Sequence, residues 1–271
     1  MPVNCLDRFA SEVNPCQDWY CVSESDGTFD VEKTFAPCST KAVALKFVAL
    51  VYVTFVFVYS LWDADDRAIW FGLLTNITLL FSVIYIWLSF VNSVIGVEQP
   101  RSHRDSVSGL VSAQWYMFHV AMHSKLVVVL LYWVVEFERG ETDISFQSIS
   151  THAGTCLTLL LEGFYVNFIP IRWFFWWGSG LLVGVGYLIW TLIHSKLDIG
   201  NGMKEDSDLL YDAVDWEDDK KGTILLFVLC LVVIGPILHS MLFCISIYGY
   251  PCCCGTNKRR YLVDKDTDEE E

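Results

Sequence analysis

Long apolar runs separated by short polar stretches dominate this chain. Five runs are near or above the ~20 residues that a helix needs to cross ~30 Å of hydrocarbon; they cover 42–62, 68–95, 113–135, 173–194 and 223–248. A sixth run, 150–171, is less apolar, but without it the connection between its neighbours would be improbably long and apolar. No run alternates with a period of two, so the backbone amides inside lipid must be satisfied by helices.

These runs predict an all-α, polytopic membrane protein with six transmembrane helices. The helical domain should span 42–248, between an acidic N-terminal segment, 1–41, that contains four cysteines and a C-terminal tail, 249–271, with a cysteine cluster and an acidic end. Pro236 has no backbone N–H and should kink the last helix. Gly180 and Gly184 form a GxxxG pair, which favours close packing of the fifth helix within the chain over dimerisation.

Composition supports the membrane prediction and excludes one class of partner. Hydrophobic residues make up 54% of the chain, and the net charge of -14 comes from residues outside the apolar runs. Nucleic-acid binding needs clustered Lys and Arg, and no basic cluster here is large enough. The N-terminus lacks the basic and apolar regions of a signal peptide, so we expect the first helix to direct insertion.

Two cysteine groups give opposing signals about orientation. An even set in the N-terminal segment would suit two disulfides outside the cytosol, whereas a cluster after the last helix, beside basic residues, is typical of cytosolic S-acylation. A small excess of Lys and Arg favours cytosolic termini, in the plasma membrane or an endomembrane, with the N-terminal thiols reduced. The first set is Cys5, Cys16, Cys21 and Cys38, and the second is Cys252, Cys253 and Cys254.

Two charged residues fall near the middle of predicted spans, where an ionisable group is costly unless it is paired or hydrated. Lys125 in the third helix and Glu162 in the fourth both lie near the expected bilayer centre at ~1.5 Å per residue. We predict that they form a buried ion pair. A structural role in helix packing is favoured over a proton or substrate relay, since buried pairs are often retained without catalytic purpose.

Three histidines are also expected within the membrane. His119 and His123 share one face of the third helix, and His239 in the sixth should lie at the depth of His123. Imidazoles at this spacing can bind a metal. No carboxylate stands at a suitable spacing, so helix packing or hydrogen bonding is the favoured interpretation, and no metal or cofactor is expected.

A hydroxyl and two imidazoles should share one leaflet. Thr75 lies in the second helix, His152 opens the fourth, and His194 ends the fifth. A hydroxyl beside an imidazole is the minimum for nucleophilic acyl transfer. Threonines also commonly hydrogen-bond the backbone of their own helix, and that interpretation is favoured.

Several short motifs occur in a characteristic order between residues 65 and 248. They are Leu73-Leu74-Thr75-Asn76, Leu130-Leu131-Tyr132-Trp133, Thr151-His152, Pro170-Ile171-Arg172 and Tyr211-Asp212-Ala213-Val214-Asp215-Trp216. In these motifs the chain resembles the rolling stone family, within the wider group that includes the androgen-induced-gene hydrolases of fatty acid esters of hydroxy fatty acids. The resemblance implies six membrane helices. Rolling stone proteins are associated with cell-surface roles such as myoblast fusion, and the hydrolases use a membrane-embedded Thr and His.

The resemblance assigns Thr75 to the position of the hydrolases' nucleophile. His152 matches the first of their two histidines, but Thr155 stands where the catalytic one would be. Thr75 therefore has no assigned base, although His152 or His194 remain candidates. The leading interpretation is a non-enzymatic membrane protein that acts through lipids or protein partners. The alternatives are a lipid ester hydrolase that uses Thr75 and His152, or a small transporter or channel that uses Lys125, Glu162 and His123.

Overall fold

The computed structural model describes residues 40–248 except 65–66, 99–108, 137–144, 168, 170, 174, 198, 200–210 and 212. The described residues form helices joined by turns, with no strand among them. The two predicted cysteine groups, at 5–38 and 252–254, lie outside the described residues. The α-helices are α3 (Thr40–Trp62), α4 (Arg67–Trp70), α5 (Leu74–Glu98), α6 (Gly109–Leu131), α7 (Phe146–Ser148), α8 (Thr155–Leu161), α9 (Leu181–Lys196), α10 (Lys220–Val228) and α11 (Gly235–Tyr248).

Wider π-helical segments extend or join several of these helices. They are η2 (Tyr132–Glu136), η4 (Ile149–Gly154), η5 (Glu162–Val166), η6 (Trp176–Gly180) and η7 (Leu229–Ile234). Within the described residues, five helices are long and apolar enough to cross a membrane: Thr40–Trp62, Leu74–Ile95, Gly109–Val134, Trp176–Lys196 and Lys220–Ser246. Five of the predicted spans are therefore confirmed.

The predicted span at 150–171 is helical but segmented. It consists of α7, η4, α8 and η5, with 3, 6, 7 and 5 residues, and it begins earlier and ends earlier than predicted. At ~1.5 Å per residue the four segments together are about as long as ~30 Å of hydrocarbon. The second predicted span, 68–95, also starts differently, because α4 and a turn precede α5.

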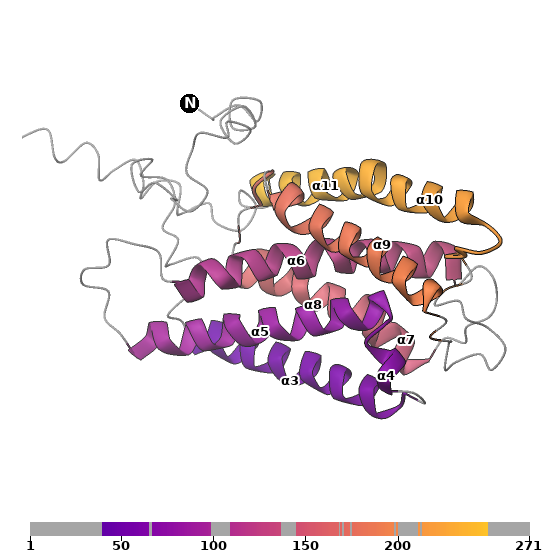
Figure 1. The fold of residues 1–271 in the computed structure, drawn as a ribbon. Coiled ribbons are helices and arrows are strands. Elements are labelled where there is room, and N and C mark those ends of the chain that lie inside the picture. The colour runs from indigo at the N-terminus through magenta and orange to yellow at the C-terminus, as the bar shows by residue number, and fades with distance from the viewer. Residues whose placement is uncertain are drawn as a thin grey trace, which may run out of the picture.

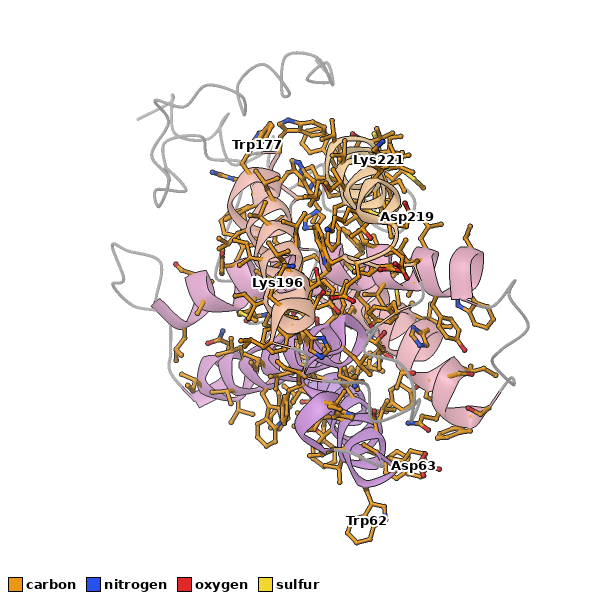
Figure 2. All side chains as sticks on the ribbon, turned by 45° about the vertical axis from the view of Figure 1, so that its right-hand side comes forward. Trp62, Asp63, Trp177, Lys196, Asp219 and Lys221 are labelled. Atoms are coloured by element: carbon orange, nitrogen blue, oxygen red, sulfur yellow. The ribbon has the colours of Figure 1, made fainter. Side chains whose placement is uncertain are left out.

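The helices lie roughly side by side in three groups (Figure 1). In Figure 1, α3 and α5 form one side of the bundle, α6 and α8 lie in the middle, and α9, α10 and α11 cover the other side. The main hydrophobic core lies where α3, α5, α6 and α8 meet, and Val53, Tyr85, Phe118 and Leu159 are fully buried there. Aromatic side chains end some helices; Trp62 projects away from the end of α3 (Figure 2), as expected for a ring at the headgroup level.

Pro236 and the glycines of the fifth span shape the α9–α11 side. The π-helical η7 directly precedes Pro236, and the N–H of Gly235 bonds to the carbonyl of Cys230. Because Pro236 cannot donate and its ring crowds the preceding turn, the helix widens there. A Cβ on Gly184 would lie 2.2 Å from a methyl of Leu231. The glycine thus allows α9 and η7 to pack closely within the chain.

Candidate functional site

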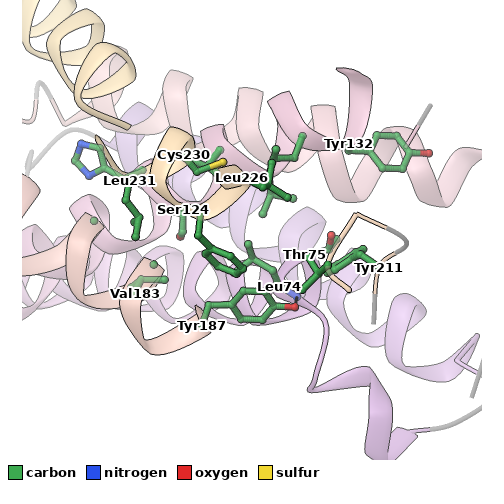
Figure 3. A pocket seen from close by; sticks show the side chains of 18 of the residues that line it. Leu74, Thr75, Ser124, Tyr132, Val183, Tyr187, Tyr211, Leu226, Cys230 and Leu231 are labelled. Atoms are coloured by element: carbon green, nitrogen blue, oxygen red, sulfur yellow. Dashed lines mark hydrogen bonds between the residues drawn. The ribbon is translucent and has the colours of Figure 1, made fainter. Parts of the chain in front are cut away.

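A cavity of about 130 Å³ lies between α5, α6, α9 and η7. Thr75 and Tyr211 lie close together toward one end, and Val183 and Leu231 lie toward the other (Figure 3). Most lining side chains are aliphatic or aromatic, and they come from helices that can span a membrane. The full lining is Leu74, Thr75, His123, Ser124, Val127, Val128, Leu131, Tyr132, Trp176, Gly180, Val183, Gly184, Tyr187, Tyr211, Ala213, Val214, Leu226, Phe227, Cys230 and Leu231.

Thr75 lies in the first turn of α5, and α9 holds this turn in place. The Leu74 amide donates to the Tyr187 hydroxyl at 3.2 Å, and that hydroxyl donates to the Gly72 carbonyl at 3.2 Å. The indole of Trp190 donates to the same carbonyl at 3.1 Å. The first amides of a helix have no partner within it, so Tyr187 satisfies one of them. These contacts position the partly buried Thr75 at the cavity.

The segment before α10 forms one wall of the cavity. Val214 lines the cavity and is buried, and the indole of Trp216 donates to the Thr191 hydroxyl of α9 at 3.1 Å. The backbone of Asp215 accepts from the Thr223 hydroxyl at 2.8 Å. Residues 213–216 of the sequence motif therefore pack against the membrane helices. Sequence reasoning identified the motif but not its place in the cavity wall.

Asp215 organises this segment through its side chain. Its carboxylate accepts from the amides of Glu217 and Asp218, each at 2.8 Å. The amides of Asp218 and Glu217 hold the pKa of Asp215 below its ordinary value, because they stabilise the charged form. Asp219 accepts from the Gly222 amide at 2.9 Å and caps α10.

His152 does not line the cavity that contains Thr75. Its imidazole stacks on the ring of Tyr132, with centroids 3.6 Å apart and an interplanar angle of 9°. Tyr132 lines the cavity, whereas His152 is not part of the lining and its Nδ1 has no hydrogen-bond partner. His194, the other candidate base, is also absent from the lining; it is buried near Trp190, with the ring centroids 5.9 Å apart.

Thr155, which occupies the place of the hydrolases' catalytic histidine, makes a local bond. Its hydroxyl is fully buried and donates to the Thr151 carbonyl one turn earlier, at 2.8 Å. This is the ordinary arrangement of threonine in a helix. The structure therefore places neither Thr155 nor His152 in the cavity beside the Thr75 hydroxyl.

The three membrane histidines lie together, and two of them bond directly. His123 Nδ1 lies 2.6 Å from the His119 carbonyl, so this nitrogen carries the proton. His123 Nε2 then accepts from His239 Nδ1 at 2.5 Å. The predicted common depth of His123 and His239 is confirmed. The rings of Phe175 and Trp176 pack against them. His123 lines the cavity, but both of its nitrogens are engaged.

The predicted ion pair between Lys125 and Glu162 is wrong. Glu162 lies 3.8 Å from Lys46 Nζ, on α3, and accepts hydrogen bonds from Tyr85 and Ser89 of α5. Lys125 Nζ has no hydrogen-bond partner. A similar depth in the membrane does not show which way a side chain faces, so it could not identify the partner of Glu162.

Asn167 and two serines complete the polar cluster around Lys46 and Glu162. The Asn167 amide donates to Glu162 at 2.5 Å, and Lys46 donates to the Ser93 hydroxyl at 2.7 Å and the Ser89 carbonyl at 3.4 Å. Sequence reasoning missed Lys46. The signal was a lysine four residues after the start of the first predicted span, 42–62.

Comparison with known proteins supports the resemblance noted from the motifs. No family model matches the chain, and no solved structure matches it. The chain is similar to Protein rolling stone of Drosophila melanogaster, with 23% identity over 184 residues. The matched stretch covers 66% of this chain and 62% of the relative, so it spans less than two thirds of the relative's length. The chain is thus a multi-pass membrane protein that is similar in sequence to Protein rolling stone.

Proposed function

We propose that this chain is a non-enzymatic membrane protein that acts by holding a lipid chain in the cavity beside Thr75. The observation that carries the proposal is the cavity lining: aliphatic and aromatic side chains of membrane-spanning helices surround a space of about 130 Å³. An apolar cavity of this kind excludes water and accepts apolar groups. Its size suits a short segment of an acyl chain rather than a whole lipid.

The surroundings of Thr75 support a role without catalysis. A threonine nucleophile needs a base within hydrogen-bond reach to accept its proton. Of the described histidines only His123 lines the cavity, and its nitrogens are bonded to the His119 carbonyl and to His239. His152 lies against Tyr132 instead. No lining imidazole has a nitrogen available to activate the Thr75 hydroxyl.

Filling the cavity tests the proposal directly. Val183→Trp puts an indole into the cavity, and Ile189→Trp, which adds the same ring to the exposed surface of α9, serves as the matched control. Lipid retained after exchange into detergent is counted by native mass spectrometry. We expect wild type and Ile189→Trp to retain a bound lipid and folded Val183→Trp to lose it. Equal retention by all three proteins would contradict the proposal.

Lipid ester hydrolysis is a second candidate, favoured by the presence of the Thr75 hydroxyl in an apolar cavity within the membrane domain. A fluorophosphonate probe that reacts with activated Ser and Thr hydroxyls distinguishes the two functions. The non-enzymatic proposal expects no labelling of the folded wild type. Labelling that disappears in both Thr75→Ala and His152→Ala, while Thr155→Ala retains it, would establish the hydrolase instead.

The orientation that we propose places both termini in the cytosol. The start of α3 and the end of α11 lie at the same end of the bundle (Figure 1), and Lys and Arg are slightly in excess at that end. Cytosolic enzymes would then reach Cys252, Cys253 and Cys254 for S-acylation. Hydroxylamine-sensitive acyl capture should recover wild type and not the triple Cys→Ser variant. Recovery of both proteins, or of neither, would contradict the assignment.

A further inference from the structure

The Thr75 hydroxyl at the cavity wall differs in its hydrogen bonding from those of several other threonines in the membrane helices. Their hydroxyls donate to a backbone carbonyl three or four residues earlier in the same helical span; these residues are Thr78, Thr155, Thr158 and Thr191. The Thr75 hydroxyl makes no such bond and has no hydrogen-bond partner among the residues that the structure describes. It therefore keeps its capacity to hydrogen-bond a ligand.

The packing of α9 explains why Thr75 lacks the usual local bond. The carbonyl three residues before Thr75 belongs to Gly72, and it already accepts from the Tyr187 hydroxyl at 3.2 Å and the Trp190 indole at 3.1 Å. A carbonyl oxygen has two lone pairs, so both are in use. Phe71, four residues before Thr75, lies in the turn that precedes α5. Two side chains of α9 thus occupy the acceptor that the Thr75 hydroxyl would otherwise use.

The rest of the cavity lining offers no charge to a ligand. Among the described residues that line the cavity there is no Lys, Arg, Asp or Glu. The Ser124 hydroxyl donates to the Val120 carbonyl at 2.5 Å, and both nitrogens of His123 are already bonded. A charged group in this cavity would be buried without a counterion, which is strongly disfavoured. The lining therefore suits an uncharged ligand.

The cavity is oriented in the membrane as an amphiphile would be. Thr75 is the second residue of the candidate span Leu74–Ile95, so it lies near the membrane boundary. Val183 and Leu231, toward the other end of the cavity (Figure 3), lie well inside the spans Trp176–Lys196 and Lys220–Ser246. Amphiphilic molecules keep their polar end at the boundary and their apolar part in the hydrocarbon. The Thr75 hydroxyl is thus at the end of the cavity where the polar group of a lipid would lie.

We propose that the Thr75 hydroxyl binds the uncharged oxygen group, a hydroxyl or an ester carbonyl, of a single-chain amphiphile whose hydrocarbon segment occupies the cavity. The inference rests on the proposed function, since the cavity must hold a lipid chain. The Thr75 hydroxyl has one proton to donate, and both ligand groups have an oxygen that accepts it. Thr75 acts here by binding, and no covalent bond forms or breaks. The site selects neutral amphiphiles over charged ones and over plain hydrocarbons.

Four photoreactive probes with the same hydrocarbon chain test the proposal on the full-length protein in nanodiscs. They end in an alcohol, a methyl ester, a permanently charged sulfonate or a plain methyl group. Attachment at Val183 in the cavity is divided by attachment at the exposed Ile189 of the same helix, so that differences in membrane uptake cancel. We expect this ratio to be about fivefold higher for the alcohol or the ester than for the methyl-ended probe, the effect of one neutral hydrogen bond. The sulfonate should give no increase.

Variants of Thr75 connect the preference to its hydroxyl. Thr75→Val keeps the branched side chain without the hydroxyl, so it should lower the ratio for the oxygen probes to that of the methyl-ended probe. Thr75→Ser, which has a hydroxyl, should retain the preference. Thr158→Val is the matched control, because it removes a hydroxyl that bonds to the Gly154 carbonyl away from the cavity lining. Ligand-free Thr75→Val should melt at or above the wild-type temperature, since it removes no hydrogen bond within the described residues.

The outcomes separate this inference from the proposed function. A preference of wild type for either oxygen probe that disappears in Thr75→Val supports the inference, and the preferred probe identifies the ligand group. Equal ratios for the oxygen and methyl-ended probes, a preference that survives in Thr75→Val, or a higher ratio for the sulfonate would overturn the Thr75 site while chain binding stands. Absence of attachment at Val183 with all four probes would overturn the cavity proposal itself.

Discussion

Removal of the charge at Lys46 is the sharpest test of the polar cluster that joins α3, α5 and the segmented helix. Lys46→Met keeps most of the side-chain volume and leaves the buried Glu162 carboxylate without its cation. Breaking a buried ion pair by removing one partner costs about 3–5 kcal/mol. We expect the lower end, about 3 kcal/mol, because Tyr85, Ser89 and Asn167 still donate to the carboxylate.

A double-mutant cycle isolates the interaction. Glu162→Gln alone should also destabilise the protein, since it leaves the Lys46 ammonium buried without its anion. The double variant Lys46→Met/Glu162→Gln contains neither charge, so it should be less destabilised than the sum of the single variants by about 2 kcal/mol. The free energies come from reversible unfolding in mixed micelles with increasing SDS. Additivity within about 0.5 kcal/mol would refute the pairing of these residues.

Two further predictions concern helix packing and acid stability. Gly235→Ala should destabilise the protein by more than about 1 kcal/mol in the same assay, because a Cβ there would lie 2.0 Å from the Trp176 ring. Gly186→Ala is the control and should be neutral or stabilising, because a Cβ at Gly186 would have no neighbouring atom within 4 Å. Because the pKa of Asp215 is lowered in the folded protein, the Asp215 carboxylate stabilises the fold. This stabilisation is complete above the ordinary Asp pKa of about 3.9 and is lost as the pH falls through the pKa that Asp215 has in the folded protein. Asp215→Asn should therefore weaken the acid dependence of stability; unchanged acid dependence would contradict this.

Hydropathy was sufficient to predict most of the fold. The five long helices follow from apolar runs too long for any other arrangement in lipid. The segmented helix was harder to delimit because Glu162 and Asn167 reduce its hydropathy. Both face inward, where Glu162 meets Lys46.

The candidate site was less predictable because it depends on how the helices are rotated and paired. The common depth predicted for His123 and His239 agrees with their contact, whereas the same argument gave the wrong partner for Glu162. The cavity wall at 211–216 could not be predicted either. A loop that returns between helices leaves no periodic signal, and Trp216 meets Thr191 only in the folded chain.

The most direct test of lipid binding is to map where a photoreactive acyl chain attaches to the protein in nanodiscs. If the cavity holds the chain, cross-linked peptides should include cavity-facing positions such as Val183 on α9 and Leu226 on α10. These attachments should disappear when an excess of unlabelled lipid is added, whereas those at the exposed Ile189 should persist. Attachment confined to exposed positions such as Ile189, with none at Val183 or Leu226, would contradict the account.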